Sequence, residues 1–245
     1  MEINKIYNES CLETLKRMDD NSLDFIVTSP PYNKGHYASG GSSKSSVWEK
    51  LNGRKIAYDV YTDDMNPDEY EQWQIDVLKE CVRVIKPTGS IFYNHKDIIN
   101  HGVIVSPKWV YNFKVRQQII WDRQSSCMLD PHYFMPANEW IYWIVKDPKQ
   151  VFFNKKESIF KTNIWRMNAE KNPHPAPFPQ IMAGNIIKCC SKEGDLVYDP
   201  FMGSGTTALC ALKFNRNFIG SEISTKYVEM AEGRIQEQQS QLPLF

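Results

Sequence analysis

Hydrophobic and polar positions along the chain follow two patterns, one with a helical period and one of short apolar runs. The clearest helical pattern covers residues 67–87, with Pro67 near its start and Pro87 just past its end. Because strand-like and helix-like segments alternate, we predict an α/β fold with a mostly parallel twisted sheet and helices on both faces. The predicted helices cover 11–18, 67–87, 182–191, 206–215 and 226–239, and the predicted strands cover 23–29, 89–95, 115–123, 139–146, 195–201 and 216–223.

Two of the predicted strands end in loops of unusual composition. The strand over 23–29 runs into TSPPYN, and two consecutive prolines can extend neither a sheet nor a helix. The strand over 195–201 runs into the glycine-rich stretch DPFMGSGTT. In open parallel sheets ligands bind at the carboxyl ends of strands, near the point where strand order reverses. We therefore expect the two loops, 28–34 and 199–206, to be walls of one site.

The glycine-rich loop has features of a nucleoside site. Gly203 and Gly205 permit a tight turn and the close approach of a ligand to the backbone. Glu222 ends the following strand, where a carboxylate can accept hydrogen bonds from both hydroxyls of a ribose. Thr206 and Thr207 stand where the G-x-G-x-x-G pattern would continue, and the lysine of a phosphate-binding loop is missing. These features favour a nucleoside ligand and leave a Rossmann oxidoreductase open as an alternative.

The composition limits the classes of protein and of site. The 245 residues have a formal net charge of +0, so contact with nucleic acid requires a local basic face. The six cysteines form no C-x-x-C pair and no zinc-type cluster, which predicts no metal site and buried free thiols at Cys189 and Cys190. The N-terminus lacks the apolar core of a leader peptide, and no apolar run has membrane-spanning length, so we expect a cytoplasmic protein.

Both loops resemble motifs of one known family. DPFMGSGTT resembles the S-adenosylmethionine loop of DNA amino-methyltransferases, and TSPPYN resembles their catalytic [DNS]-P-P-[YFW] tetrapeptide. The catalytic motif comes first and the cofactor loop last, an order similar to that of the β class, which includes cytosine-N4 and adenine-N6 enzymes. HPAPFP at 174–179 resembles the segment that precedes the cofactor loop in that class. The resemblance implies a Rossmann-like methyltransferase fold with a single catalytic domain over 1–245.

The resemblance also implies roles in binding S-adenosylmethionine. Phe201 would pack on the adenine ring of the cofactor, and Glu222 would hold its ribose. Gly203 and Gly205 would admit its methionine part. The residues that would complete the cofactor pocket are Asp199, Thr206, His174, Pro175 and Phe178.

One position departs from the family pattern. Family members often carry aspartate near the end of the first strand, whereas this chain has Ser10 there with Glu9 beside it. A serine hydroxyl can still hydrogen-bond an adenine edge, although more weakly than a carboxylate. Whether Ser10 or Glu9 serves the cofactor stays open at this point.

The tetrapeptide suits methyl transfer to an exocyclic amino group, whose lone pair is delocalised into the ring of its base. Ser29 Oγ and the Pro30 carbonyl can each accept one amino hydrogen, and Pro30 and Pro31 fix the direction of that carbonyl. Tyr32 offers a flat face on which an extruded base can stack. Within the family that the chain resembles, serine at the first position favours N4 of cytosine as the target, whereas asparagine after the tyrosine, here Asn33, is common among adenine-N6 enzymes. We therefore predict a site-specific DNA methyltransferase that acts on N4 of cytosine, with N6 of adenine as the alternative target. The other alternative, a non-catalytic DNA-binding subunit, is disfavoured because both motifs are intact.

Double-stranded DNA is the expected partner. Residues 34–60 are predicted to form a mobile loop whose basic side chains can follow phosphates. These basic residues are Lys34, Lys44, Lys50, Arg54 and Lys55. The interval between NEWIYWIVK and HPAPFP, where larger members of the family place a recognition domain, is short, so loops within 94–138 are the candidates for reading the target. A homodimer stays open, and the tail at 241–245, QLPLF, resembles the peptide by which bacterial proteins bind the replication sliding clamp.

Overall fold

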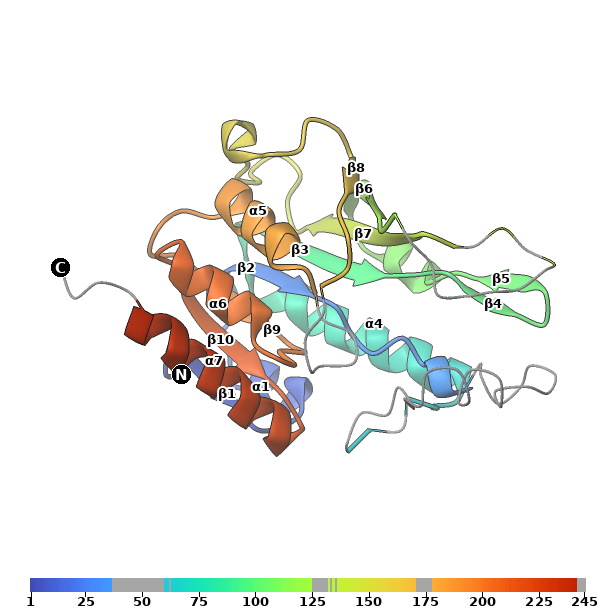
Figure 1. The fold of residues 1–245 in the computed structure, drawn as a ribbon, viewed down its shortest axis with the longest axis horizontal. Coiled ribbons are helices and arrows are strands. Elements are labelled where there is room, and N and C mark those ends of the chain that lie inside the picture. Colours follow the sequence, from blue (N-terminus) through green and yellow to red (C-terminus); the bar gives the residue numbers. More distant parts are fainter. Residues whose placement is uncertain are drawn as a thin grey trace.

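The computed structural model describes residues 1–36, 60–61, 63–124, 132, 134, 136–170 and 178–241, and Figure 1 shows the fold. The helices are α1 (Cys11–Lys16), α4 (Pro67–Val84), α5 (Gln180–Cys190), α6 (Thr206–Lys213) and α7 (Thr225–Gln241), with short 3-10 helices η1 (Lys108–Asn112) and η2 (Lys155–Glu157). The strands are β1 (Lys5–Tyr7), β2 (Leu23–Thr28), β3 (Ile85–His95), β4 (Ile98–Asn100), β5 (Val103–Val105), β6 (Val115–Asp122), β7 (Asn138–Val145), β8 (Ile164–Arg166), β9 (Leu196–Asp199) and β10 (Asn217–Ser221). Every helix and strand predicted from the hydrophobic pattern is present, with bounds shifted by a few residues.

Among the described residues, eight strands form one sheet in the order β1-β10-β9-β2-β3-β7-β6-β8, while β4 and β5 form a separate antiparallel ribbon. The neighbours from β1 across to β3 are parallel, and β8 is parallel to β6. β7 runs antiparallel to both β3 and β6. The mostly parallel sheet is therefore confirmed. The sequence does not predict β1, β4, β5 and β8, because three-residue strands carry too little of either hydrophobic period.

Strand order reverses between β2 and β9 at the centre of the sheet. From β2 the chain continues to β3 on one side, and from β9 it continues to β10 on the other. Because β2 and β9 are parallel, their carboxyl ends lie at the same edge of the sheet. The Thr28 hydroxyl at the end of β2 donates a hydrogen bond of 2.7 Å to Asp199 Oδ1 at the end of β9. The fold thus places the two loops side by side at the position where such sheets bind ligands.

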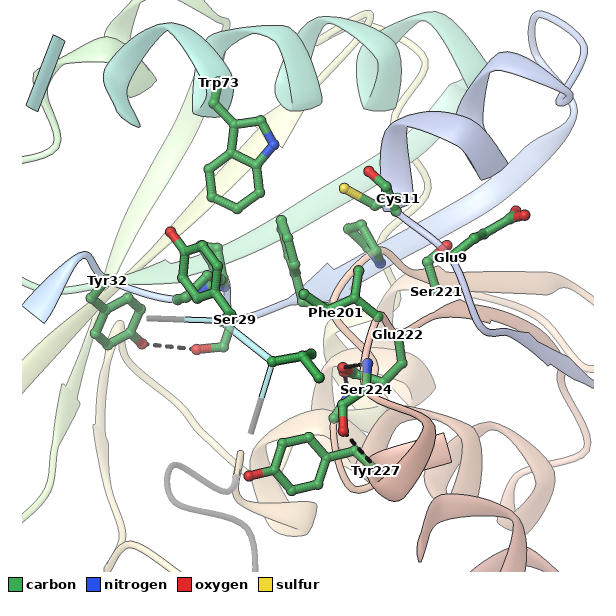
Figure 2. Close-up of a pocket in the computed structure, with 18 residues that line it drawn as sticks. Glu9, Cys11, Ser29, Tyr32, Trp73, Phe201, Ser221, Glu222, Ser224 and Tyr227 are labelled. Carbon is green, nitrogen blue, oxygen red and sulfur yellow. Dashed lines mark hydrogen bonds between the residues drawn. The ribbon is translucent and has the colours of Figure 1, made fainter. Parts of the chain in front are cut away.

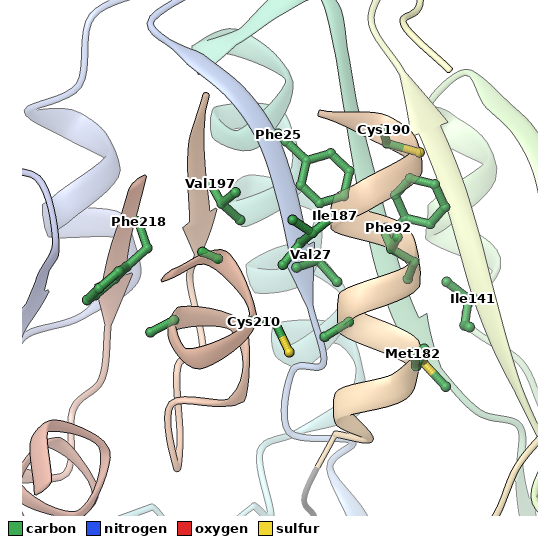
Figure 3. Packing of buried hydrophobic residues seen from close by; sticks show 14 of the residues in the cluster. Phe25, Val27, Phe92, Ile141, Met182, Ile187, Cys190, Val197, Cys210 and Phe218 are labelled. Carbon is green, nitrogen blue, oxygen red and sulfur yellow. The ribbon is translucent and has the colours of Figure 1, made fainter. Parts of the chain in front are cut away.

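Helices cover both faces of this sheet, and the side chains of β2 alternate between them. Phe25 and Val27 pack in the cluster formed with α5, α6 and α7, where Ile187 is one neighbour (Figure 3). Ile26 packs on the opposite face with α1 and α4, where Leu78 is part of the cluster. Because both faces are covered, β2 is a continuous apolar run rather than an alternating one. This explains why its sequence predicts a buried strand.

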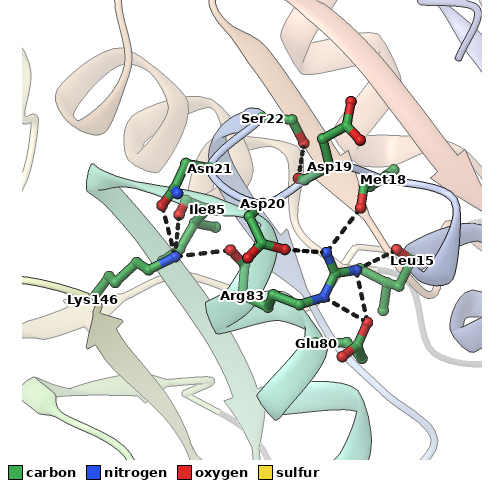
Figure 4. A network of polar contacts seen from close by, with 10 residues as sticks. All are labelled: Leu15, Met18, Asp19, Asp20, Asn21, Ser22, Glu80, Arg83, Ile85 and Lys146. Carbon is green, nitrogen blue, oxygen red and sulfur yellow. Dashed lines mark hydrogen bonds and ion pairs between the residues drawn. The ribbon is translucent and has the colours of Figure 1, made fainter.

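Arg83 near the end of α4 fixes this helix at the edge of the sheet opposite to the site (Figure 4). Its guanidinium donates hydrogen bonds to two carbonyls and two carboxylates, those of Leu15, Met18, Asp20 and Glu80. Lys146 just past β7 donates to the Arg83 carbonyl at 2.8 Å. With its C-terminal end fixed in this way, α4 extends along the sheet and carries Tyr70 and Trp73 to the other edge.

The cysteines of α5 behave as the sequence predicts. Cys189 and Cys190 are buried free thiols, and burial raises the pKa of Cys190 well above its ordinary value. Within the described ranges, no set of three or more His, Cys, Asp or Glu side chains is arranged to hold a metal ion. No helix in the same part of the chain combines the length and apolarity needed to cross a bilayer.

Candidate active site

A cavity with about 820 Å³ of empty space opens at the carboxyl ends of β2 and β9 (Figure 2). One wall is the loop from Ser29 to Tyr32, which follows β2. The facing wall contains Phe201, Gly203 and Glu222, which follow β9 and β10. A concave site lined by aromatic rings together with a few polar groups is typical of small-molecule sites. The structure therefore brings the two predicted loops together in one cavity.

The loop after β2 ends in a tight turn at Asn33. This residue has a left-handed backbone with φ of 58°, which asparagine tolerates better than most residues. The amides of Asn33 and Lys34 donate to the buried carboxylate of Asp63 at 2.7 and 2.9 Å. The Asn33 side chain is also buried, and it donates to the Met65 carbonyl at 2.7 Å. Asn33 is therefore a turn residue here, and it does not line the cavity.

The two prolines differ in what their carbonyls contact. Tyr70 of α4 donates its hydroxyl to the Pro31 carbonyl at 2.7 Å. No hydrogen bond to the Pro30 carbonyl occurs within the described part of the chain, and Pro30 lines the cavity. Because proline has a fixed φ, the direction of this carbonyl is set by the turn. The Pro30 carbonyl is thus left as an acceptor for a ligand.

Ser29 and Tyr32 meet a buried polar cluster from the neighbouring strands. Their hydroxyls lie 2.8 Å apart, and the Tyr32 hydroxyl donates to Glu139 Oε2 at 3.0 Å. Asn94 of β3 donates to the Tyr32 oxygen and, at 2.9 Å, to the same carboxylate oxygen of Glu139. Arg123, just past β6, pairs with Glu139 Oε1 at 2.8 Å. We call these five residues the Ser29–Glu139 cluster.

Tyr32 is packed tightly, with 5% of its surface exposed. The His95 ring lies 4.7 Å away between centroids, and Lys34 Nζ lies over the Tyr32 ring at 4.9 Å. Burial lowers the pKa of His95 to about 3, so its ring is neutral at pH 7. His95 Nε2 and the Tyr70 hydroxyl are 2.9 Å apart. The face on which a base is predicted to stack therefore belongs to a side chain held from several sides.

The facing wall combines an aromatic pair with a fixed carboxylate. Glu222 Oε2 accepts the Gly203 N–H at 2.8 Å, and Oε1 accepts the Ser224 N–H at 2.9 Å. The left-handed φ of 51° at Gly203 turns the loop so that its amide faces this carboxylate. Phe201 and Trp73 stand edge to face, with ring centroids 5.6 Å apart. All five residues line the cavity, and the sequence predicts three of them for the site, the exceptions being Trp73 and Ser224.

Asp199 lies behind the cavity wall, not in it. Its buried carboxylate accepts the hydroxyls of Thr28 and Thr207 at 2.7 and 2.6 Å and the Phe201 N–H at 3.0 Å. Burial raises the pKa of Asp199 to about 6. The sequence analysis predicts that Asp199 lines the pocket. In the structure, its hydrogen bonds instead hold the start of the glycine-rich loop.

Three other residues predicted for the cofactor pocket are not part of its lining. Gly205 has φ of 81° and faces α7, where an added Cβ would lie 2.8 Å from the Ala231 Cβ. Thr206 begins α6, and its buried hydroxyl has no hydrogen-bond partner within the described ranges. Phe178 packs against the core cluster of α5. His174 and Pro175 lie outside the described residues.

Ser10 and Glu9 both line the cavity. Ser10 is the N-cap of α1, and its Oγ accepts the Leu12 N–H at 3.4 Å. The Glu9 carboxylate pairs with Arg17 and accepts the Thr14 hydroxyl at 2.6 Å. Glu9 is therefore engaged within the protein, whereas the Ser10 hydroxyl hydrogen has no acceptor in the part of the chain that the structure describes.

Of the five basic residues predicted to contact DNA, the structure describes only Lys34. Lys34 is half-buried beside Tyr32. Lys44, Lys50, Arg54 and Lys55 lie outside the described residues, as does the tail after Gln241. Inside the predicted 94–138 segment, the β4–β5 ribbon projects beyond the main sheet (Figure 1).

Besides Ser224, sequence reasoning missed Trp73, Tyr61, Asn94 and Glu139 at this site. For the last two a signal was present. Asn94 ends the apolar run IFYN, and Glu139 starts NEWIYWIV, so each is a polar residue at the end of a buried strand. Because the carboxyl end of a parallel strand lies at the ligand-binding edge, Asn94 was a reasonable candidate. Glu139 starts its strand and reaches the same edge only because β7 runs antiparallel to β3. Trp73 lies in an ordinary amphipathic helix and gives no comparable signal.

The chain matches the family model N6_N4_Mtase, described as DNA methylase, over residues 23–233. That span contains both loops of the cavity and the Ser29–Glu139 cluster. The chain belongs to this DNA methylase family. The type II methyltransferase M.BglII of Bacillus subtilis is 30% identical to this DNA methylase over 269 residues, which cover 94% of this chain and 68% of that protein.

Solved structures show the same fold. The PvuII DNA methyltransferase (cytosine-N4-specific) aligns with this DNA methylase at a TM-score of 0.73 and 18% identity, covering 96% of this chain and 90% of that one. TTHA0409 from Thermus thermophilus, complexed with S-adenosyl-L-methionine, aligns at 0.67 and 19% identity, covering 98% and 95%. At these identities the likeness concerns the fold, and it confirms the predicted Rossmann-like methyltransferase architecture.

S-adenosylmethionine is the cofactor of this family, and the cavity of this DNA methylase fits it. The Phe201 ring on the cavity wall, with Trp73 edge-on beside it, suits stacking with a planar adenine, and the fixed Glu222 carboxylate suits the two hydroxyls of a ribose. The residues present are therefore those that such a cofactor needs.

Proposed function

We propose that this DNA methylase is a site-specific enzyme that methylates N4 of a cytosine flipped out of double-stranded DNA, with N6 of adenine as the alternative target. The single observation that carries the proposal is the shared cavity. Ser29 and Pro30 border the same space as Phe201 and Glu222. Acceptors suited to an amino group thus lie across from a slot suited to a nucleoside cofactor.

The cofactor half of the cavity would bind S-adenosylmethionine through its rings and its fixed carboxylate. Phe201 and Trp73 would enclose the adenine, while Glu222 would accept hydrogen bonds from the ribose hydroxyls. Ser10, with its hydroxyl hydrogen available, would contact the adenine edge in preference to the paired Glu9. When bound, S-adenosylmethionine supplies a methyl group made electrophilic by the positive charge on its sulfur.

The other half of the cavity would prepare the target amino group. Ser29 Oγ and the Pro30 carbonyl would each accept one of its two N–H groups, which localises the nitrogen lone pair and directs it at the methyl group. Ser29 and Pro30 would thus hold the amino nitrogen in line with the methyl group that S-adenosylmethionine would supply, so that a nitrogen–carbon bond could form in place of the sulfur–carbon bond. The amino nitrogen then loses one proton to solvent, because a hydroxyl and a carbonyl are too weakly basic to retain it. Tyr32 would hold the base through its ring once Lys34 moves aside.

Serine in the first position of the tetrapeptide supports cytosine N4. The opposing indication from Asn33 carries less weight, because its side chain is buried in the turn and bonded to the Met65 carbonyl. Turn geometry is a sufficient reason for asparagine at this position. The family name covers both kinds of target, so the base itself belongs to the proposal.

We also propose that DNA contacts come from loop 34–60 and from the 94–138 segment of this single catalytic domain. A two-stranded ribbon such as β4–β5 has the width to enter a major groove. The match to type II methyltransferases favours a role beside a restriction enzyme of the same specificity.

Mass spectrometry of nucleosides tests the proposal directly. DNA from a host without its own methylation would be collected after expression of the wild-type chain or of Ser29→Ala. We expect N4-methylcytosine in the wild-type sample alone, and single-molecule sequencing would locate the mark in a fixed sequence context. N6-methyladenine in its place would select the alternative target, and the absence of both would refute the proposal.

A further inference from the structure

The Ser29 hydroxyl can donate or accept a hydrogen bond, and only the accepting state suits the proposed reaction. A serine hydroxyl carries one hydrogen and two lone pairs. If its hydrogen points into the cavity, it meets the N–H hydrogens of the target amino group and repels them. An ionised aspartate has no such hydrogen. With serine at this position, a neighbouring group must direct the hydrogen away from the cavity.

Tyr32 is placed to receive that hydrogen. The Ser29 and Tyr32 oxygens are 2.8 Å apart, and either one could donate. Tyr32 has a single hydroxyl hydrogen, and its oxygen also lies 3.0 Å from Glu139 Oε2. An ionised carboxylate can only accept. Once Tyr32 gives its hydrogen to Glu139, the bond between Ser29 and Tyr32 forms only with Ser29 as the donor.

The surroundings of Glu139 keep it an acceptor. Its side chain is 7% exposed, and Arg123 pairs with Oε1 at 2.8 Å. A carboxylate that pairs with a guanidinium offers only lone pairs to its other neighbours. Asn94 donates to Oε2 at 2.9 Å and also to the Tyr32 oxygen. Every contact to the Glu139 carboxylate within the described ranges thus comes from a donor, so Tyr32 meets an acceptor there.

We propose that Glu139 is a positioning residue that fixes Ser29 as a hydrogen-bond acceptor, acting through Tyr32. In this arrangement Ser29 donates its hydroxyl hydrogen to Tyr32, and Tyr32 donates its own to Glu139. Asn94 Nδ2 lies 3.4 Å from Ser29 Oγ, but its two N–H groups are directed at the closer Tyr32 and Glu139 oxygens, so the lone pairs of Ser29 Oγ are available to the target amino group. This inference rests on the proposed function, because it concerns the same reaction.

Glu139→Gln tests the direction of these two hydrogen bonds. The Arg123 charge attracts the amide oxygen of the new side chain, which turns its NH₂ group toward Tyr32. Tyr32 then donates to Ser29, and the Ser29 hydrogen turns into the cavity. We expect kcat for DNA methylation to fall about 10- to 100-fold, the effect of losing a hydrogen bond to a charged group. The Kd for S-adenosylmethionine, measured by calorimetry, should stay within about twofold of wild type, because Glu139 lies outside the cofactor half.

A double-mutant cycle separates this role from a structural one. In a Ser29→Asp background the acceptor has no hydrogen, so Glu139→Gln should cost less than about threefold. Tyr32→Phe removes the hydroxyl that connects Ser29 with Glu139, so in this background Glu139→Gln should again lower kcat only slightly. A structural defect would instead lower kcat by the same factor in all three backgrounds. Two variants also test this series of hydrogen bonds without Glu139→Gln. Ser29→Asp, added to Tyr32→Phe, should restore the activity that Tyr32→Phe alone has lost.

The outcomes are distinguishable. Equal loss in the wild-type and Ser29→Asp backgrounds, or no loss in Glu139→Gln, would overturn the role of Glu139 and leave the proposed function intact. A wild-type chain that binds S-adenosylmethionine but methylates no DNA would overturn the proposed function, and this inference with it. A loss confined to backgrounds with both Ser29 and Tyr32 supports it.

Discussion

The two halves of the cavity are built in different ways. On the cofactor side, the Glu222 carboxylate is held by two backbone amides, and Phe201 is aimed by the loop between β9 and α6. On the catalytic side, Ser29 depends on side-chain contacts, with Tyr32 of its own loop and, through Tyr32, with Asn94 and Glu139 of other strands. The first half therefore relies on backbone geometry, and the second relies on tertiary side-chain contacts.

This difference has a physical consequence for mutation. A backbone-built site tolerates changes in distant side chains, because its donors are amides that every residue except proline supplies. A side-chain cluster in a buried environment loses more than one bond when one member is removed, because the remaining groups stay desolvated. Variants in the two halves should therefore fail in different ways, binding on one side and turnover on the other.

The largest effect is expected on the catalytic side, from Ser29→Ala. The variant removes the acceptor for the target amino group, so kcat should fall about 100- to 1,000-fold. Transfer of a labelled methyl group to DNA measures this change. Cofactor affinity should be unaffected, and Ser240→Ala on the exposed surface of α7 provides the control. Near-normal turnover in Ser29→Ala would remove Ser29 from the mechanism.

Phe201→Ala should damage the cofactor side. Loss of the ring that would stack on adenine is expected to raise the Kd for S-adenosylmethionine about 10- to 100-fold. Isothermal titration calorimetry measures the affinity. Phe153→Ala, a half-exposed phenylalanine outside this cavity, should leave the Kd unchanged. Equal Kd values for the two variants would contradict the assigned slot.

A glycine series tests how far the backbone builds the cofactor side. Gly205→Ala combines a φ of 81° with a Cβ contact of 2.8 Å to Ala231, so we expect a loss of about 2–4 kcal/mol in the free energy of unfolding. Gly194→Ala has a similar φ of 85° but open space, and should lose about 1 kcal/mol. Gly233→Ala, in α7 with nothing within 4 Å, should gain about 0.5–1 kcal/mol. Urea denaturation gives all three values, and a different ranking would refute the packing argument.

The smallest net effect concerns pH, because the two halves oppose each other. Burial lowers the pKa of His95 from 6.5 to about 3, so the folded state binds fewer protons there and stability is lost as pH falls through that window. Burial raises the pKa of Asp199 from 3.8 to about 6, so the folded state binds more protons there and stability is lost as pH rises through that window.

Single variants should expose these opposite slopes. Between pH 4 and 6, the Tm of wild type minus that of His95→Gln should increase with pH, because unfolding protonates His95 in wild type and the variant lacks this group. The corresponding difference for Asp199→Asn should decrease with pH over the same range. Differential scanning fluorimetry across the pH series measures both, and parallel slopes would show that one of the two pKa directions is wrong.

Most of the fold could be predicted from the hydrophobic pattern, because its periods of 2 and 3.6 residues follow from backbone geometry. The strand β2 illustrates this, since Phe25, Ile26 and Val27 are buried on both faces and read as one apolar run. The short strands β1 and β8 could not be predicted from the sequence, because three residues are too few to show a hydrophobic period. The antiparallel β7 was likewise not distinguishable from a parallel strand by its composition.

The sequence by itself determined the end of β2 at two prolines, the glycine turn after β9 and the acid that follows β10. These are local features, set by which φ and ψ values proline and glycine allow. Only the tertiary structure decided which side chains surround Ser29. Asn94 and Glu139 reach it through the strand order β2-β3-β7-β6 and through a register that pairs Asn94 with Ile141 and Trp121 with Glu139. Strand order and register depend on how distant segments pack, and no local period along the chain encodes them.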